Sequence, residues 1–360
     1  MGDTGERLDI YSPMHLLNGV WDYKTGRRTI LHRAVPVLKP DTETFKVEKY
    51  TPADVRRELD SIQLGRGGDD PPLVTFSSGD DTFSVKPYGL GTMVQHGDAS
   101  NVKKRYNKQT TALRRLISNT ALQEEIAFAT LATTLANYAT NNKEDLTGGT
   151  LITDAGLALL TKVQQAKERI MLETGAVRFD MYISMDQVVY IRKNTEFTSA
   201  LGSHRDNFLG KDTEALEEMF ATVFGVDRVF ISSGVKNTAG VKKTGVNTFV
   251  WGESIVIAAA DAALEGGGSS EGPIETLLPD AETLDISGFY RFLWEDPAEM
   301  AKEDRSAEVT NLGHYQMLRE VMARKRATRL DLLYWALTKA GILDSSGKII
   351  SAYLIKSPLS

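Results

Sequence analysis

The sequence predicts an α+β protein, and three observations predict it. Residues 101–142 contain neither Pro nor Gly, which indicates one long helix. Residues 28–98 hold several short runs in which apolar and polar residues alternate, as they do in half-buried strands. Residues 148–285 mix helical and strand patterns, and we expect them to form a compact unit with helices over a mixed sheet.

The composition limits the classes of function. The chain has 360 residues, of which 41% are hydrophobic and 25% charged, enough for two or three folded units of ordinary globular composition. The net charge of −6 argues against a protein drawn to nucleic acid by an overall basic surface. The absence of Cys excludes disulfides, thiolate metal sites and cysteine nucleophiles, and fits a reducing cytosol. Neither a signal peptide nor an uninterrupted apolar stretch of about 18 residues occurs, so we expect no membrane span.

Residues 1–27 are polar and mixed but carry a group of large apolar side chains. The group consists of Tyr11, Met14, Leu16, Leu17, Val20 and Trp21. We expect a segment with so many large apolar side chains to dock on a surface. That surface is either the core of its own chain or a neighbouring subunit.

Residues 28–98 are predicted to form strands, some of them in a projecting arm. The expected strands are 29–31, 35–38, 44–47, 73–76 and 82–85. Pro36 confines the second of them to a sheet edge or a strand end. The Gly- and Asp-rich run at 64–72 indicates a polar loop. Strand pairs that flank such an insert predict an extended two-stranded arm, which needs a partner surface because an isolated hairpin is only marginally stable.

The long helix is predicted to cover residues 107–139. Lys103, Lys104 and Arg105 would lie unfavourably at the positive end of the helix dipole, so Asn107 is the better N-cap. Apolar residues recur mostly three to five positions apart on one side, namely Leu113, Leu116, Ile117, Leu122, Ile126, Leu131, Leu135 and Tyr138. At about 1.5 Å per residue the rod is roughly 50 Å long, which indicates a spine along which other parts lie.

The compact unit at 148–285 is expected to alternate helices and strands. One helix is expected at 151–173, with Thr153 or Asp154 near its cap and Gly175 after its end, and another at 213–224 behind Asp212. The expected strands are 179–184, 227–232 and 248–258. A short helix or turn is expected at 185–193, and loops at 194–211, 233–245 and 265–282.

The last part of the chain is harder to assign. A strand is expected at 289–294, a charged loop at 295–313 and a final strand at 349–355. Residues 315–343 are open to two interpretations. Their composition favours helix, whereas the alternation at 328–332 favours strand.

One motif matches the pattern of a serine hydrolase. Residues 268–272 read Gly-Ser-Ser-Glu-Gly, which satisfies G-x-S-x-G, with Ser270 as nucleophile and His314 as a downstream base. The nucleophile elbow needs a tight strand-to-helix turn, whereas this match lies in a Gly- and Ser-rich run followed by Pro273. A surface loop is therefore the favoured interpretation, and a hydrolase is an unfavoured alternative.

Two glycine-containing segments fail as nucleotide-binding motifs. In 234–244 five residues separate Gly234 from Gly240, and Val241 stands where a phosphate-binding loop requires Lys. Residues 89–94 lack the third Gly of a dinucleotide fingerprint. Both segments are predicted to be turns.

The remaining polar residues form no recognisable centre. The five His residues have no metal-ligand spacing; they are His15, His32, His96, His204 and His314. Adjacent acidic residues on a helix point apart, so solvated faces are expected for the pairs Asp69-Asp70, Asp80-Asp81 and Glu217-Glu218. The basic clusters 103–105 and 324–326 lack interleaved aromatic residues for base stacking. We therefore assign no catalytic, cofactor-binding or metal-binding residue and expect no cofactor.

Several short motifs occur in a recognisable order. They are Arg-Ala-Val-Pro-Val at 33–37, Thr-Phe-Lys-Val at 44–47, Arg-Gly-Gly at 66–68, Thr-Phe-Ser-Val at 82–85 and Tyr-Gly-Leu at 88–90. The helical stretch 116–127 with Glu124 and Glu125 follows, then Asn-Thr-Phe-Val-Trp-Gly at 247–252 and Phe-Tyr-Arg-Phe at 289–292. In this order, over about 28–356, the sequence resembles the major capsid proteins of tailed bacteriophages, which have the Hong Kong 97-like fold.

The resemblance implies a subunit layout. Its parts are an N-terminal arm at 1–27, an extended loop with peripheral-domain strands at 28–98, the spine helix of the peripheral domain at 99–147, an axial domain at 148–285, a return to the peripheral domain at 286–340, and a segment at 341–360 whose strand is expected to rejoin the axial domain. The resemblance also implies a strand hairpin at 315–335. No long acidic or helical segment precedes residue 28, so no N-terminal scaffolding domain is expected. No residue matches a Lys–Asn cross-linking site.

The function implied by the resemblance is structural and not enzymatic. The chain is expected to assemble with itself into hexamers and pentamers of an icosahedral shell that encloses double-stranded DNA without sequence recognition. Scaffolding, portal and decoration proteins are the other expected partners, with no membrane. The expected location is the virion, after assembly in the bacterial host cytoplasm. The alternative with the same fold is an encapsulin-like nanocompartment shell that encloses cargo.

Overall fold

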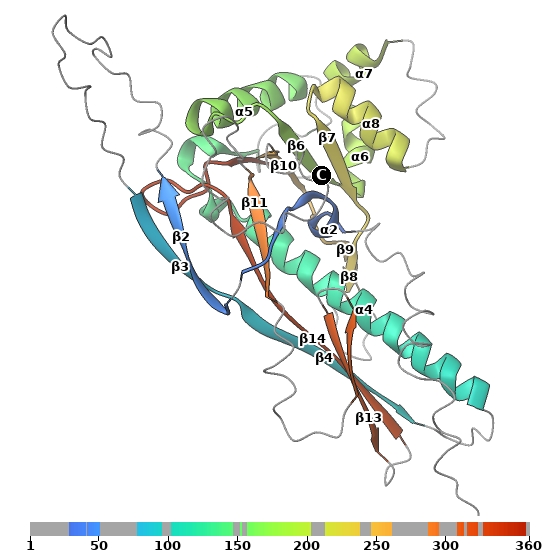
Figure 1. Cartoon of the computed structure of the whole chain (residues 1–360). Coiled ribbons are helices and arrows are strands. Elements are labelled where there is room, and N and C mark those ends of the chain that lie inside the picture. The colour runs from blue at the N-terminus through green and yellow to red at the C-terminus, as the bar shows by residue number, and fades with distance from the viewer. Residues whose placement is uncertain are drawn as a thin grey trace, which may run out of the picture.

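The computed structural model describes most of the chain in separate ranges. These ranges are 29–40, 42–50, 78–95, 102–146, 152, 157–202, 213–237, 246–260, 287–294, 308–312, 315–322 and 327–357. Within them, two β-sheets and two short ribbons are arranged around one long helix (Figure 1). The predicted α+β class is confirmed. No helix among these residues is both long enough and apolar enough to cross a membrane.

The long helix is α4, Val102–Thr133. It begins before the predicted residue 107 despite the basic residues in its first turns, and it ends before the predicted residue 139. The Thr133 and Thr134 hydroxyls donate to backbone carbonyls one turn back, at 2.7 and 2.6 Å, which competes with regular helix geometry. Thr134 then takes an extended conformation, with φ −88° and ψ 110°, before the 3-10 turn η3, Leu135–Asn137. Two consecutive threonines thus end this helix without Gly or Pro.

A five-stranded mixed sheet forms the compact half of the molecule. In spatial order its strands are β5 (Lys143–Asp145), β15 (Ala352–Lys356), β10 (Ser254–Ala259), β6 (Phe179–Ser184) and β7 (Arg228–Ser232). β15 is parallel to β5 and β6 is parallel to β7, whereas β10 is antiparallel to both of its neighbours. The predicted mixed sheet is confirmed, and the final strand does join it.

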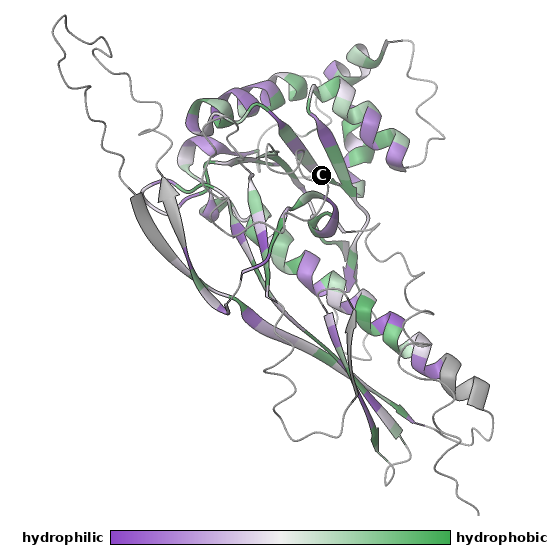
Figure 2. Ribbon diagram, viewed as in Figure 1, coloured by the Kyte–Doolittle hydropathy of each residue, from purple (hydrophilic) through white to green (hydrophobic). Residues whose placement is uncertain are grey.

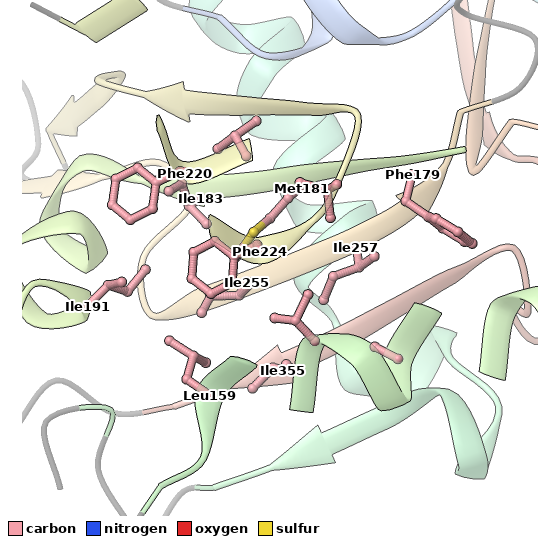
Figure 3. Close-up of a cluster of buried hydrophobic side chains, with 14 of the residues drawn as sticks. Leu159, Phe179, Met181, Ile183, Ile191, Phe220, Phe224, Ile255, Ile257 and Ile355 are labelled. Carbon is pink, nitrogen blue, oxygen red and sulfur yellow. The ribbon is translucent and has the colours of Figure 1, made fainter. Parts of the chain in front are cut away.

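Helices cover one face of this sheet. They are α5 (Leu159–Thr174), α6 (Met185–Ile191), α7 (Thr195–Leu201) and α8 (Thr213–Phe224). Side chains alternate along β6, so Met181 and Ile183 join the core beneath these helices (Figure 3), whereas Tyr182 points to the opposite face. The sheet therefore has two buried faces, and the second one rests on α4.

Four sequence predictions in this half need correction. The loop expected at 233–245 contains the short strand β8 (Val235–Asn237). The loop expected at 194–211 contains α7, because the Asn194 side chain accepts from the Phe197 amide as an N-cap at 3.1 Å. The strand expected at 248–258 is divided between β9 (Asn247–Phe249) and β10, because Gly252 turns the chain with φ +54°. α5 begins at Leu159 and not at residue 151. The expected caps Thr153, Asp154 and Asp212 lie outside the described residues.

A six-stranded sheet forms the elongated half. Its strands are β1 (Val37–Leu38), β4 (Lys86–Gln95), β11 (Phe289–Trp294), β12 (Glu308–Leu312), β13 (Tyr315–Met322) and β14 (Ala327–Ala340). β13 pairs with the first half of β14 and β11 with its second half, while β4 runs antiparallel to residues 327–336. β1 lies at the end of the sheet and pairs with β11, as expected for a strand preceded by Pro36.

The β13–β14 hairpin confirms the strand interpretation of 315–335 over the helical one. β12 shows that part of the loop expected at 295–313 is strand. The turn predicted at 89–94 is wrong, because these residues lie within β4. Added Cβ atoms at Gly89 and Gly91 would lie 2.4 Å from Leu333 and 2.2 Å from Asp331. Because Gly89 and Gly91 have no Cβ atom, the side chains of Leu333 and Asp331 can lie against the backbone of β4.

Two ribbons and a short helix complete the fold. β2 (Thr44–Tyr50) and β3 (Ser78–Ser84) form an antiparallel ribbon at one side of the molecule (Figure 1). The strand predicted at 29–31 is wrong, because Leu31 begins a short helix, α2 (Leu31–Ala34), and residues 29–30 belong to no strand. β8 (Val235–Asn237) pairs with β9 in a second ribbon.

The helix α4 joins the two halves. In its first half, Leu113, Leu116 and Ile117 share a core with β13 and β14. In its second half, Phe128 and Ala132 share another core with β6, β10 and β15. Green apolar positions along α4 lie beside purple polar ones in Figure 2. The predicted role of this helix as a spine is therefore visible in its packing.

Candidate functional site

Two adjacent glutamates of α4, Glu124 and Glu125, are buried at the junction of the two sheets. Consecutive helical residues point about 100° apart, so the two carboxylates serve different neighbours. Burying a carboxylate without hydrogen-bond donors is very unfavourable. Their partners therefore indicate what this junction is built to hold.

Glu125 holds the start of α2 and the turn before β10. Its carboxylate oxygens accept hydrogen bonds from the backbone amides of Ile30 and Leu31, both at 2.9 Å, and from Trp251 Nε1 at 2.5 Å. The first amides of a helix have no partner within the helix, and here the carboxylate supplies it. Burial raises the pKa of Glu125, although these three hydrogen bonds act in the opposite direction.

Glu124 connects α4 to the six-stranded sheet. It pairs with the buried Arg291 of β11 at 2.5 Å, accepts from the Tyr315 hydroxyl of β13 at 2.8 Å, and lies 3.0 Å from His32 Nε2. Burial, together with the nearby charge of Glu124, raises the pKa of Tyr315 well above its usual range. This carboxylate therefore ties three separate elements to the spine.

Glu217 of α8 completes the set. It accepts two hydrogen bonds from the Arg33 guanidinium, at 2.9 and 2.5 Å, and one from the Ile231 amide at 2.8 Å. Arg33 also lies over the Phe230 ring, 5.2 Å from its centroid. The solvated position predicted for Glu217 is wrong, whereas its neighbour Glu218 is exposed as expected.

We call Glu124, Glu125 and Glu217 the junction carboxylates. All three contact the segment 30–33, so one short stretch of chain is fixed to the spine, to the six-stranded sheet and to the helical layer. Each of these carboxylates accepts hydrogen bonds from groups of the protein itself. This arrangement suits them to set the angle between the two halves of the molecule.

The ribbon β2–β3 is fixed at its base by aromatic side chains. The Phe45 ring lies 4.9 Å from that of Phe292 and 5.9 Å from that of Phe83, and Phe83 stacks on Phe292 at 5.7 Å. Among the described strands, β2 and β3 pair only with each other. An aromatic cluster thus anchors the base of this two-stranded ribbon, and the extended arm stays a prediction.

A groove of about 530 Å³ lies between α4, β4 and β14. Its lining is mainly apolar and includes Leu31, Leu90, Ile126 and Leu131. Glu124 and Arg291 lie at its inner side. The groove therefore adjoins the junction carboxylates.

Most of the candidate residues predicted from the sequence lie outside the described residues. Ser270 and His314, the hydrolase candidates, lie outside the described residues, as do His15, His96 and His204. His32 lies against Glu124. Within the described ranges no group of three or more His, Asp or Glu side chains is arranged to hold a metal ion.

The sequence carries a partial signal for this junction. Glu124 and Glu125 are the only charged residues within 116–133 of α4, and Arg291 is the one charged residue within the aromatic strand 289–294. Because buried charges are usually paired, acids and bases in such apolar surroundings predict mutual contact. Which acid contacts which base depends on the fold.

Comparison with known proteins gives three relevant similarities. No family model matches the chain. A major capsid protein of Pseudomonas phage JBD67 is 27% identical over 150 residues, which are 42% of this chain and 48% of that protein. The chain thus spans about half the length of the curated relative that it matches. The predicted resemblance to phage major capsid proteins is confirmed by this relative.

The structural similarity extends over nearly the whole chain. A phage-related protein from Bordetella bronchiseptica has a TM-score of 0.60 at 15% identity, covering 96% of this chain and 97% of that one, and shares the fold. The capsid of cyanophage P-SCSP1u has a TM-score of 0.48 at 12% identity, covering 93% and 90%.

Proposed function

We propose that this chain is the major capsid protein of a tailed bacteriophage, a structural subunit that assembles into an icosahedral shell around double-stranded DNA. The sequence similarity to a phage major capsid protein and the fold shared with a phage-related protein support the proposal. The motif order described above points to the same family.

The observation that carries the proposal is the projecting ribbon β2–β3. It pairs with no other described strand, yet its base is held firmly by Phe45, Phe83 and Phe292. A two-stranded ribbon is marginally stable alone, so a protein that displays one gains most by placing it against a neighbour. In a shell, the ribbon of each subunit would lie over the next subunit.

The proposed layout assigns the two halves to different places in the shell. The unit at 148–285, joined by the strand of 341–360, would form the axial domain that meets its copies at the symmetry axes. Residues 28–98, 99–147 and 286–340 would form the extended loop and the peripheral domain, with 1–27 as the N-terminal arm. The junction carboxylates would then set the angle between these domains.

The proposed partners follow from this role. The chain would form hexamers and pentamers with itself and would contact scaffolding, portal and decoration proteins. The net charge of −6 suits a shell that holds DNA without binding it tightly, because tight binding depends on basic contacts to phosphate. The role is not enzymatic, and the proposed location is the virion after assembly in the host cytoplasm.

Expression of the full chain in bacteria tests the proposal. We expect capsomers or closed shells in size-exclusion chromatography and electron microscopy, with the chain alone or with phage scaffolding and portal proteins supplied. A Phe45→Asp variant, which places a charge in the aromatic base of the ribbon, should remain folded by circular dichroism but fail to form shells.

A wild-type chain that stays monomeric both alone and with the phage proteins would overturn the proposal. Shells that consistently enclose one cellular protein would instead favour the nanocompartment alternative.

A further inference from the structure

The groove between α4, β4 and β14 leaves large apolar side chains exposed. Tyr88 is 47% exposed and Leu90 is 38% exposed, and both line the groove. Its volume of about 530 Å³ lies within the usual range of binding pockets, roughly 300–1,000 Å³. Apolar surface of this kind, bordered by polar groups, generally marks a place where another group docks.

The chain itself leads to this groove. The backbone amide of Leu31 is fixed by Glu125, and Leu31 is one of the residues that line the groove. Thr29, the first described residue, precedes Leu31 by only two positions. Trp21 precedes Thr29 by eight residues, which reach at most about 28 Å at roughly 3.5 Å per residue. Trp21 is therefore tethered within reach of the groove of its own chain.

The preceding segment has matching chemistry. Tyr11, Met14, Leu17 and Trp21 recur three or four positions apart, so a helical turn would place them on one side. Trp and Tyr need hydrogen-bond partners for their polar atoms when they are buried. Thr120 and Gln123, which also line the groove, offer such partners.

We propose that residues 11–21 dock in the groove of their own chain, covering Tyr88 and Leu90. This goes beyond the proposed shell function, because it holds for a single subunit before any assembly. Residues 11–21 lie outside the described residues, so the proposal rests on the open groove, the tether length and the apolar pattern. A tethered segment has a high effective concentration, which favours the intramolecular site over the same site on a second copy.

The absence of Cys makes the test specific. In a Val20→Cys, Leu90→Cys double variant the two introduced thiols are the only ones in the chain. We expect a short bismaleimide to join them at least about tenfold faster than in Val20→Cys, Leu172→Cys, because tethering to the groove raises the local concentration. Leu172 is a matched control, since it is a leucine on α5 that is 74% exposed.

Isotope mixing identifies the occupant. When chains labelled with 14N and 15N are mixed before reaction, docking within one chain predicts cross-linked peptides without heavy-light pairs. Heavy-light pairs in the statistical proportion would show that a second copy occupies the groove and would overturn the proposal. Equal rates with Cys at positions 90 and 172 would also overturn it.

A second measurement uses a single substitution. In Leu90→Cys, a maleimide should label the thiol several-fold faster when residues 1–21 have been deleted, because the groove is then uncovered. An unchanged labelling rate would contradict docking. Neither measurement uses shell formation as its readout, so failure of this proposal and failure of the proposed function remain distinguishable.

Discussion

Trp251 donates its indole N–H to Glu125 at 2.5 Å, although the two residues are 126 positions apart. Trp251 lies in the turn between β9 and β10, and Glu125 lies in α4. The same indole ring also meets Phe128 edge-on, with centroids 5.2 Å apart. One polar and one aromatic contact thus fix the spine against the five-stranded sheet.

Replacing Glu125 by Leu should strongly destabilise the protein. The change leaves the amides of Ile30 and Leu31 and the Trp251 indole without their acceptor. Each buried unsatisfied donor costs about 1–3 kcal/mol, so we expect the free energy of unfolding to fall by at least about 3 kcal/mol. Urea denaturation measures it. Glu218→Leu, at an exposed position of α8, is the control, and an equal effect of both changes would contradict the role of Glu125.

The pair Arg291–Glu124 should show strong coupling. Arg291→Met leaves the buried Glu124 without its charged partner, which typically costs about 3–5 kcal/mol. Adding Glu124→Gln removes the charge that Arg291 balanced, so the double variant should be more stable than the sum of the single effects predicts. Arg329→Met is the control, because its ion pair with Asp331 is more exposed and should contribute less than about 1 kcal/mol. Strict additivity would refute the coupling.

Stability should depend on pH through Glu125. Because its pKa in the folded chain is raised above the ordinary value of 4.5, the folded state binds this proton more tightly than the unfolded state. The contribution of Glu125 to the free energy of unfolding therefore decreases as pH rises from 4.5 through the raised pKa. Glu125→Gln lacks this titration, so its stability should fall less over the same interval. If the free energy of unfolding changed with pH in the same way for the wild type and for Glu125→Gln, titration of Glu125 would not contribute to stability.

Phe45→Ala should loosen the ribbon more than the rest of the molecule. Removing a buried Phe side chain typically costs about 3–5 kcal/mol, and the loss falls on the contacts with Phe83 and Phe292. We expect faster amide hydrogen exchange in β2 and β3, with β6 and β10 unchanged. Lys46→Ala, on the exposed side of the same strand, should leave exchange almost as it is. Uniform loss of protection would show that the base supports the whole fold instead.

Gly341→Ala should be far more damaging than Gly252→Ala. A Cβ atom at Gly341 would lie 1.7 Å from the backbone oxygen of Ser287, so the chain must shift, and we expect a loss of about 3 kcal/mol or more. At Gly252 no atom lies within 4 Å of an added Cβ, but φ is +54°. Gly252→Ala should therefore lower the free energy of unfolding only by the strain of Ala in the left-handed conformation, about 1–2 kcal/mol. Thermal or urea unfolding compares them. Equal losses would contradict the close approach at Gly341.

Local signals were sufficient for some elements. The helix predicted at 213–224 is α8, Thr213–Phe224, and the strand predicted at 179–184 is β6. In both, the hydrophobic period and the flanking residues agree with the final structure. Gly175, predicted to follow a helix, takes the left-handed conformation there with φ +82°.

Other features depend on contacts between distant residues. Residues 89–94 form a strand because β14 pairs with them, and nothing within this segment indicates that partner. The buried position of Glu217 follows from Arg33, which is 184 residues away. Local patterns therefore predicted most elements, whereas the junction carboxylates required knowledge of which segments meet.

The position of β15 has a consequence for protein synthesis. This strand lies between β5 and β10 in the sheet, although both precede it in the chain. Since the ribosome makes the chain from its N-terminus, both partners emerge while the place between them is still empty. The sheet can close only after residue 356 has left the ribosome. A product that terminates before this strand would keep open edges on β5 and β10, so synthesis through residue 356 becomes a condition for closing the five-stranded sheet.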